Sequence, residues 1–96
     1  MDKKFINASV YQTRGIAALS SEEPFQSEIF EALRRFYDCD WGFICDEDKK
    51  VNNIAMKYND FILAAYRTSQ GEIWITAESQ NGICYDTITI LFPSEY

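Results

Sequence analysis

Two segments of the chain carry apolar side chains at helical spacing. The first spans about residues 22–37, and its apolar stripe consists of Phe25, Ile29, Leu33 and Phe36. Ser20 and Glu23 have the spacing of a capping box before this helix, and Pro24 suits its first turn. The second helix is predicted at about residues 46–58, with a buried stripe of Val51, Ile54, Ala55 and Tyr58.

Runs rich in β-branched and aromatic residues predict strands elsewhere. One short strand is expected near the N-terminus and three in the last third of the chain, at residues 5–11, 61–68, 72–79 and 83–92. Gly15, in the TRGI segment after the first strand, is expected to make a turn or bulge.

The Asn81-Gly82 pair between the last two strands is a strong hairpin signal, because both residues tolerate positive φ. A two-residue turn there gives one isoleucine-rich face, which is the predicted core face. Its pairs are Ile75 with Ile88 and Ile73 with Ile90, and the pairs on the other face are Trp74 with Thr89, Thr76 with Thr87 and Glu78 with Tyr85.

The first of the two hairpins leaves two alternatives open. A two-residue Gln70-Gly71 turn leaves Arg67 opposite Trp74. It also turns three side chains toward the core, those of Ile62, Ala64 and Tyr66. A three-residue turn reverses these orientations.

These elements predict a single α+β domain over residues 1–96. The expected architecture is an antiparallel meander of the three C-terminal strands, extended by the N-terminal strand. Both helices are expected to pack on its isoleucine face.

Charge and composition narrow the classes of function. Fifteen acidic residues face nine basic ones, so the net charge is −6, and the basic residues form no stripe. Direct binding of nucleic acid through its phosphates is therefore disfavoured. No apolar run approaches the roughly 20 residues of a membrane span, and no apolar segment follows the basic pair at the N-terminus. An odd set of three cysteines, Cys39, Cys45 and Cys84, indicates reduced thiols, and we expect a cytoplasmic protein.

The sequence also lacks the usual parts of an active site. The chain contains no histidine, which excludes Ser-His-Asp and Cys-His catalysis and zinc sites that use histidine. Three cysteines without close pairing do not match a thiolate zinc site, and neither a GxGxxG motif nor a P-loop is present. We therefore expect no enzymatic activity and no cofactor.

Two candidate chemical sites remain, and each has a structural alternative. Asp46, Glu47 and Asp48 could bind a divalent cation, but adjacent residues diverge around a helix, and an acidic first turn is favoured instead. Cys45 or Cys84 could act as a nucleophile, but neither has an evident base, so a small inert side chain is favoured.

Aromatic residues offer a candidate contact surface. Tryptophan and tyrosine often anchor protein interfaces, and this chain offers Trp41, Trp74, Tyr85 and Tyr96. In the predicted register Trp74 and Tyr85 share the sheet face opposite the isoleucines. The alternative is that this is an ordinary half-exposed face or is covered by the N-terminal segment.

Three segments carry a resemblance to a known group of proteins. They are TRGI, DWG followed by CDEDKKVNN, and IWIT with TITILFPSEY at the end of the chain. The sequence resembles small uncharacterised proteins, often described as plasmid-related, of Gram-positive plasmids, prophages and conjugative elements. That group has no assigned activity, so the resemblance implies no functional residues. It implies a cytoplasmic accessory protein of a mobile element, a setting in which small acidic proteins often block host defence machinery.

These observations favour a non-enzymatic, acidic protein-binding module, such as an inhibitor of a basic, nucleic-acid-handling host protein of the restriction or CRISPR kind. Its acidic surface would comprise Asp38, Asp40, Asp46, Glu47 and Asp48, and its anchor would be Trp41 or Trp74. The first alternative is a homodimer with a structural or regulatory role, formed through the Trp74 face or an edge strand. The second is a small enzyme or ligand-binding domain that uses carboxylates and a metal.

Overall fold

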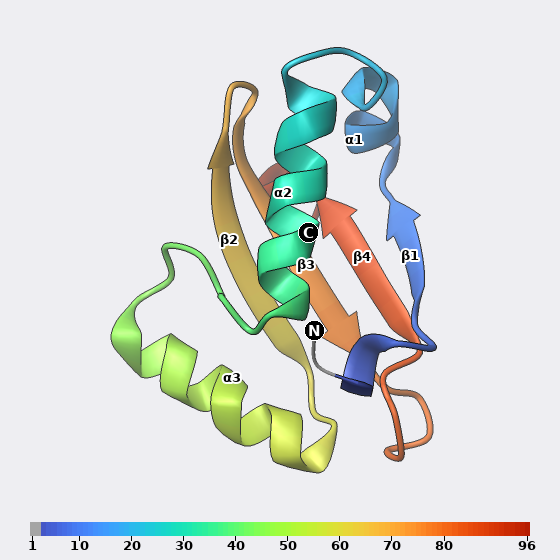
Figure 1. Cartoon of the computed structure of the whole chain (residues 1–96), viewed down its shortest axis with the longest axis vertical. Coiled ribbons are helices and arrows are strands. Elements are labelled where there is room, and N and C mark those ends of the chain that lie inside the picture. The colour runs from blue at the N-terminus through green and yellow to red at the C-terminus, as the bar shows by residue number, and fades with distance from the viewer. Residues whose placement is uncertain (1–2) are drawn as a thin grey trace.

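A computed structural model describes residues 3–96 of the chain. In chain order its elements are η1 (Lys3–Phe5), β1 (Ser9–Gln12), α1 (Arg14–Leu19), α2 (Phe25–Tyr37), α3 (Asp46–Tyr58), β2 (Ile62–Thr68), β3 (Gly71–Glu78), β4 (Thr87–Leu91) and η2 (Pro93–Glu95). The predicted α+β class is confirmed, and in Figure 1 α2 crosses in front of the sheet while α3 lies beside the lower end of β2.

The sheet has the strand order β1-β4-β3-β2. Strands β2, β3 and β4 form the predicted antiparallel meander. Strand β1 extends this meander but runs parallel to β4, so the sheet as a whole is mixed. The N-terminal strand is also shorter than predicted, because Lys3–Phe5 forms a 3-10 turn that buries the Phe5 ring in the core.

The β3–β4 register differs by two residues from the prediction. Ile75 lies opposite Ile90, and Ala77 opposite Ile88. The connection is a loop over residues 79–86, in which the Asn81 carboxamide oxygen accepts hydrogen bonds from the amides of Ile83 (2.8 Å) and Cys84 (3.3 Å). Because side chains alternate with a period of two, a shift of two residues keeps every strand side chain on its predicted face.

The first hairpin turns at Ser69 and Gln70, because Thr68 lies opposite Gly71. Arg67 therefore lies opposite Glu72 rather than Trp74, and Trp74 lies opposite Ala65. The core side of β2 carries the side chains that the two-residue alternative predicted, namely Ile62, Ala64 and Tyr66.

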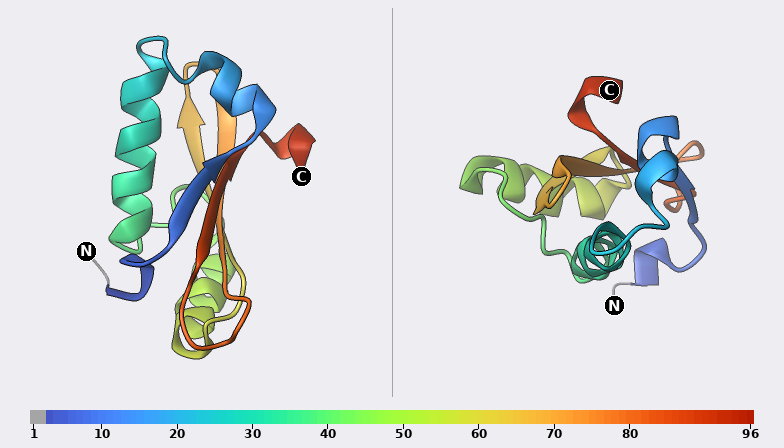
Figure 2. Two further views of the ribbon diagram at one scale, coloured as in Figure 1. Left: turned by 90° about the vertical axis from the view of Figure 1, so that its right-hand side faces the viewer. Right: turned by 90° about the horizontal axis from the view of Figure 1, so that it is seen from above.

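Helix α2 covers one face of the sheet, while the turn η2 lies on the other side, as both views in Figure 2 show. The buried side chains of α2 are Phe25, Ile29, Ala32 and Phe36, and Leu33 is half-buried against the core. The helix begins at Phe25 rather than at residue 22, and the predicted capping box is absent from it. The Glu23 carboxylate instead accepts a hydrogen bond from the Ser27 amide (2.9 Å), and Pro24 occupies the N-cap position.

Gly15 lies inside helix α1, so the predicted turn or bulge at this residue was wrong. The glycine leaves room for close packing: the Glu95 carboxylate accepts hydrogen bonds from the Gly15 amide (2.9 Å) and the Thr13 hydroxyl (2.6 Å). A Cβ atom on Gly15 would lie 2.8 Å from a Glu95 carboxylate oxygen. The beginning of α1 and the C-terminal turn η2 are thereby joined.

Candidate functional site

Helix α3 spans Asp46–Tyr58, as the sequence predicted, but it buries a different face. Its buried side chains are Asn52, Ala55 and Met56. Of the predicted stripe only Ala55 is buried, because Val51, Ile54 and Tyr58 are 60%, 56% and 67% exposed. The prediction of a buried Val51–Ile54–Tyr58 stripe was therefore wrong.

Polar contacts on the inward side of α3 fix its rotation. The Asn52 side-chain amide donates to the Leu63 carbonyl (2.9 Å), and the Tyr85 hydroxyl shares its proton between the Asp60 carbonyl (2.7 Å) and the Ala55 carbonyl (3.2 Å). Asn59 ends the helix in the left-handed conformation, with φ of 56°. Because these anchors are polar, hydrophobic periodicity gives no sign of them.

The exposed apolar residues of α3 continue onto the adjoining chain. Phe61, just before β2, is 46% exposed, and Ile44 and Leu63 are half-buried. A depression of about 280 Å³ lies between these elements, lined by Ile44, Asp48, Val51, Asn52, Phe61 and Leu63. We call this depression the α3 groove, and we call the surrounding apolar surface the α3 face, comprising Ile44, Val51, Ile54, Tyr58, Phe61 and Leu63.

Acidic residues lie at one end of the α3 face. Asp46, Glu47 and Asp48 form the exposed first turn of α3, as the structural alternative predicted. None of the ion pairs found within residues 3–96 involves them, and Asp48 is the charged residue that lines the α3 groove. Within residues 3–96, no group of three or more Cys, Asp and Glu side chains is placed to hold a metal ion.

The segment around DWG closes the outer edge of β2. The Ala65 amide donates to the Trp41 carbonyl (3.3 Å), and the Phe43 amide donates to the Ala65 carbonyl (3.0 Å). Gly42 has a φ of 78°, and a Cβ atom there would lie 1.8 Å from the Ala65 carbonyl oxygen. This position therefore requires glycine, because a side chain would collide with the strand.

Two predicted binding residues are part of the structure around this edge. Trp41 is only 2% exposed, and its indole N–H donates to the Asn53 side chain (2.9 Å), so it is not available as an anchor. Asp40 forms an ion pair with Arg35 (2.7 Å) and accepts a hydrogen bond from the Gly42 amide. The Arg35 guanidinium lowers the pKa of Asp40 below its usual value.

Two further predicted binding residues, Tyr85 and Trp74, lie in different environments. Tyr85 is buried in the core, with its ring centroid 5.2 Å from that of Phe5, so its placement on the Trp74 face was wrong. The reason is that Tyr85 belongs to the loop before β4, and its hydroxyl donates to the Asp60 carbonyl (2.7 Å). Trp74 is half-buried and packs edge-on against Tyr96, at a centroid distance of 5.4 Å.

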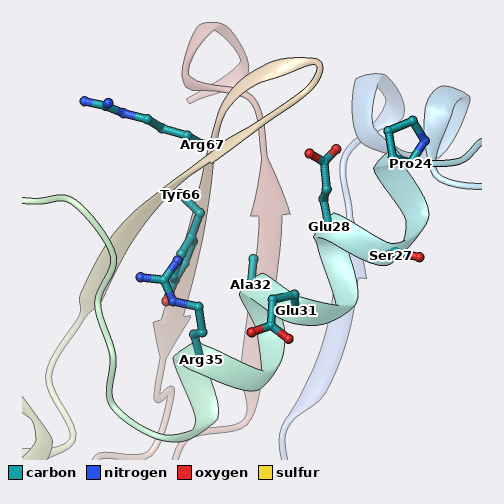
Figure 3. A pocket seen from close by; sticks show the side chains of 8 residues that line it. All are labelled: Pro24, Ser27, Glu28, Glu31, Ala32, Arg35, Tyr66 and Arg67. Carbon is teal, nitrogen blue, oxygen red and sulfur yellow. The ribbon is translucent and has the colours of Figure 1, made fainter.

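A second depression, of about 240 Å³, lies between α2 and β2 (Figure 3). Its charged side chains are already engaged: Glu28 with Ser69 (2.6 Å), Glu31 with Arg34, and Arg35 with Asp40. Arg67 extends away from α2 in Figure 3 and lies over the Phe43 ring, 4.5 Å from its centroid. Glu28 and Glu31 are therefore already bonded to other residues of the protein, and we assign no ligand to this depression.

The cysteines lie apart from these two depressions. Within residues 3–96 no disulfide joins them; Cys45 is exposed at the N-cap of α3, and Cys39 and Cys84 are half-buried. The lining of neither depression includes a cysteine.

No protein-family model, curated protein or solved structure matches the chain, so the resemblance to plasmid-related proteins stays a prediction. Among the helices of residues 3–96, none has the length and apolar character that a membrane crossing requires.

Proposed function

We propose that the chain is a non-enzymatic protein-binding module and that the α3 face is its docking surface. The observation that carries this proposal is the exposure of Val51, Ile54 and Tyr58 on one side of a helix whose other side is anchored in the core. Val51 also lines the α3 groove, and exposed apolar residues that share one surface are typical of interaction sites.

The charge around the α3 face supports a basic partner. Asp38 and Asp40, which the sequence placed in an acidic surface, pair with Arg34 (3.3 Å) and Arg35 (2.7 Å) in the structure. The acids of the first turn of α3 have no such ion pair, and the whole chain carries a net charge of −6. Within this function, a basic nucleic-acid-handling protein is the kind of partner that we propose, and its inhibition is the expected consequence.

Quantitative capture from a lysate of the source cells tests the proposal. The three baits are the wild-type protein, a Val51→Gln/Ile54→Gln variant, and Phe30→Gln, which changes a 64% exposed residue on α2. Glutamine keeps helix propensity and adds no charge. A protein that is retained by the wild type and Phe30→Gln, but lost from the double variant, supports the proposal. Equal retention by all three baits contradicts it.

A homodimer is the second candidate, and the free edge of β1 favours it. All four residues of β1 are exposed, and the left view in Figure 2 shows nothing covering this strand. The amides of Ser9 and Thr13 donate toward β4, so those of Val10 and Gln12 point outward by alternation. Residues 6–13 carry no charge, and charged or proline residues are the usual protection of an edge.

A two-fold axis at Tyr11 would pair Val10 of one copy with Gln12 of the other. In that register Tyr11 faces its own copy at the short Cα separation of a non-hydrogen-bonded pair, about 4.5 Å, which a disulfide can bridge. In a Cys45→Ser background, Tyr11→Cys should therefore oxidise to a covalent dimer, whereas Val10→Cys should not. A monomer by light scattering, together with no covalent dimer of Tyr11→Cys, eliminates this candidate.

A further inference from the structure

We infer that the α3 groove takes one apolar side chain from a cationic amphipathic helix of the partner. This inference rests on the proposed function and specifies the chemistry of the binding partner. Four features of the groove support it: the shape of the apolar ridge, the closed edge of β2, the size of the depression and the position of the acids.

The ridge has the geometry of a helix-packing surface. Val51, Ile54 and Tyr58 follow one another at positions i, i+3 and i+7, so they form a nearly straight row along α3. The row from Val51 to Tyr58 is about 10 Å long, at a rise of about 1.5 Å per residue. Rows of this kind pack against the ridges of a second helix, and apolar anchors at i, i+3, i+4 and i+7 recognise such a surface.

A partner strand is disfavoured, because most backbone groups on the outer edge of β2 beside the groove are already bonded. The Leu63 carbonyl accepts the Asn52 amide (2.9 Å), and both backbone groups of Ala65 bond to the segment Trp41–Phe43 (3.3 and 3.0 Å). Addition of a strand needs unpaired backbone donors and acceptors. Recognition at the α3 groove must therefore act through side chains.

The size of the groove fits an anchor side chain. Its volume of about 280 Å³ lies below the roughly 300–1,000 Å³ of sites that bind small molecules. Its walls are mainly apolar, formed by the side chains of Ile44, Val51, Phe61 and Leu63. The groove therefore has room for one large apolar side chain of a packed helix.

The acids specify a cation beside that anchor. Asp48 lines the groove, and Asp46 and Glu47 precede it in the same helical turn. A Lys or Arg about one turn from the apolar anchor would meet the Asp48 carboxylate. A second copy of the chain would bring another net charge of −6, which disfavours it as the occupant.

Two designed peptides test the inference directly. Both are amphipathic helices with Leu at i, i+3, i+4 and i+7; one carries Lys at its polar positions and the other carries Glu. Titration into the wild-type protein and into Ile54→Gln, Asp48→Asn and the control Phe30→Gln measures the affinity of each, after circular dichroism has shown that the variants are folded.

The Leu/Lys peptide is expected to bind the wild type and Phe30→Gln alike. Ile54→Gln should weaken this binding about tenfold, and Asp48→Asn should weaken it at low salt but not at high salt. The Leu/Glu peptide should not bind. Equal binding of both peptides, or an Ile54→Gln variant with unchanged affinity, overturns the inference.

The failure of this inference can be told apart from failure of the proposed function. If a lysate protein is lost from the Val51→Gln/Ile54→Gln bait while the Leu/Lys peptide fails to bind, the α3 face docks a partner of another shape. If the wild type self-associates and Ile54→Gln abolishes the dimer, the occupant is a second copy and the inference is wrong. If the substitutions change neither the capture of lysate proteins nor the affinity for the peptide, the α3 face is not a docking surface.

Discussion

The rotation of α3 is open to a direct test by two alanine substitutions, Met56→Ala and Ile54→Ala. Met56 is only 8% exposed, and truncation of a buried methionine costs about 2–5 kcal/mol of unfolding free energy. Ile54 is 56% exposed, so less than half of the roughly 1.5–3 kcal/mol of a fully buried isoleucine is at stake. Alanine also restores a few tenths of a kcal/mol of helix propensity. We therefore expect Ile54→Ala to cost about 0.5 kcal/mol or less.

Urea unfolding followed by circular dichroism measures both costs by linear extrapolation. Because the extrapolated free energies carry an uncertainty of about 10–15%, a difference of about 2 kcal/mol between the variants is resolved. Equal costs for Ile54→Ala and Met56→Ala would refute the reasoning, since α3 would then bury the stripe that hydrophobic periodicity predicts. Repeating the measurement at a higher protein concentration reveals whether self-association covers Ile54.

Three further predictions concern the segments that hold the fold together. Gly42→Ala should cost about 3 kcal/mol or more, because the new Cβ would lie 1.8 Å from the Ala65 carbonyl oxygen; an unchanged melting temperature would contradict this. Asp40→Asn should destabilise the protein at neutral pH and less so near pH 3. The lowered pKa of Asp40 gives a stabilisation that is complete above its unfolded value and is lost as pH falls through its folded value. Urea unfolding at the two pH values tests this, and a difference that is undiminished in acid would be inconsistent with it. The Thr13 hydroxyl lowers the pKa of Glu95, so Thr13→Val should raise it in an NMR titration; identical titrations would disprove the contact.

The sequence predicted the elements of the fold better than their pairing. Strong periodicity placed α2, a weaker pattern placed α3, and β-branched and aromatic runs identified the three strands of the meander. The β3–β4 pairing was shifted because Asn81 and Gly82 lie in a broader loop, where the Asp86 carboxylate accepts a hydrogen bond from the Gln80 amide (2.9 Å). The isoleucine face was still predicted correctly, because a shift of two residues leaves side chains on the same face.

Hydrophobic patterning failed where a polar side chain lies inside. Asn52 is buried, and its amide bonds to the Leu63 carbonyl, so the inward face of α3 has an amide at its centre. A search for an apolar stripe therefore selected the neighbouring face, with Val51, Ile54 and Tyr58. The same residues became the candidate site because the structure leaves them exposed. The sequence signal that could have indicated this was the surplus of apolar residues around α3, more than one buried face requires.

The three segments that distinguish this sequence have structural roles. In TRGI, Thr13 and Gly15 contact the Glu95 carboxylate of LFPSEY. In DWG, Trp41 is buried and Gly42 packs against β2. These contacts join parts of the chain that are far apart in sequence, which explains why local patterns could not assign them. The candidate site overlaps one of these segments, because CDEDKKVNN supplies Asp48 and Val51 of the α3 groove.

Photo-crosslinking from the α3 face tests the central claim most directly. A benzophenone amino acid is placed at Tyr58, which is 67% exposed on α3, or at Phe30, which is 64% exposed on α2, and each protein is irradiated in a lysate of the source cells. We predict a discrete crosslinked adduct from Tyr58 that is absent from Phe30 and is lost when Val51 and Ile54 are changed to Gln. An adduct from Phe30 alone, or one from Tyr58 that survives those substitutions, would contradict the claim that the α3 face is the docking surface.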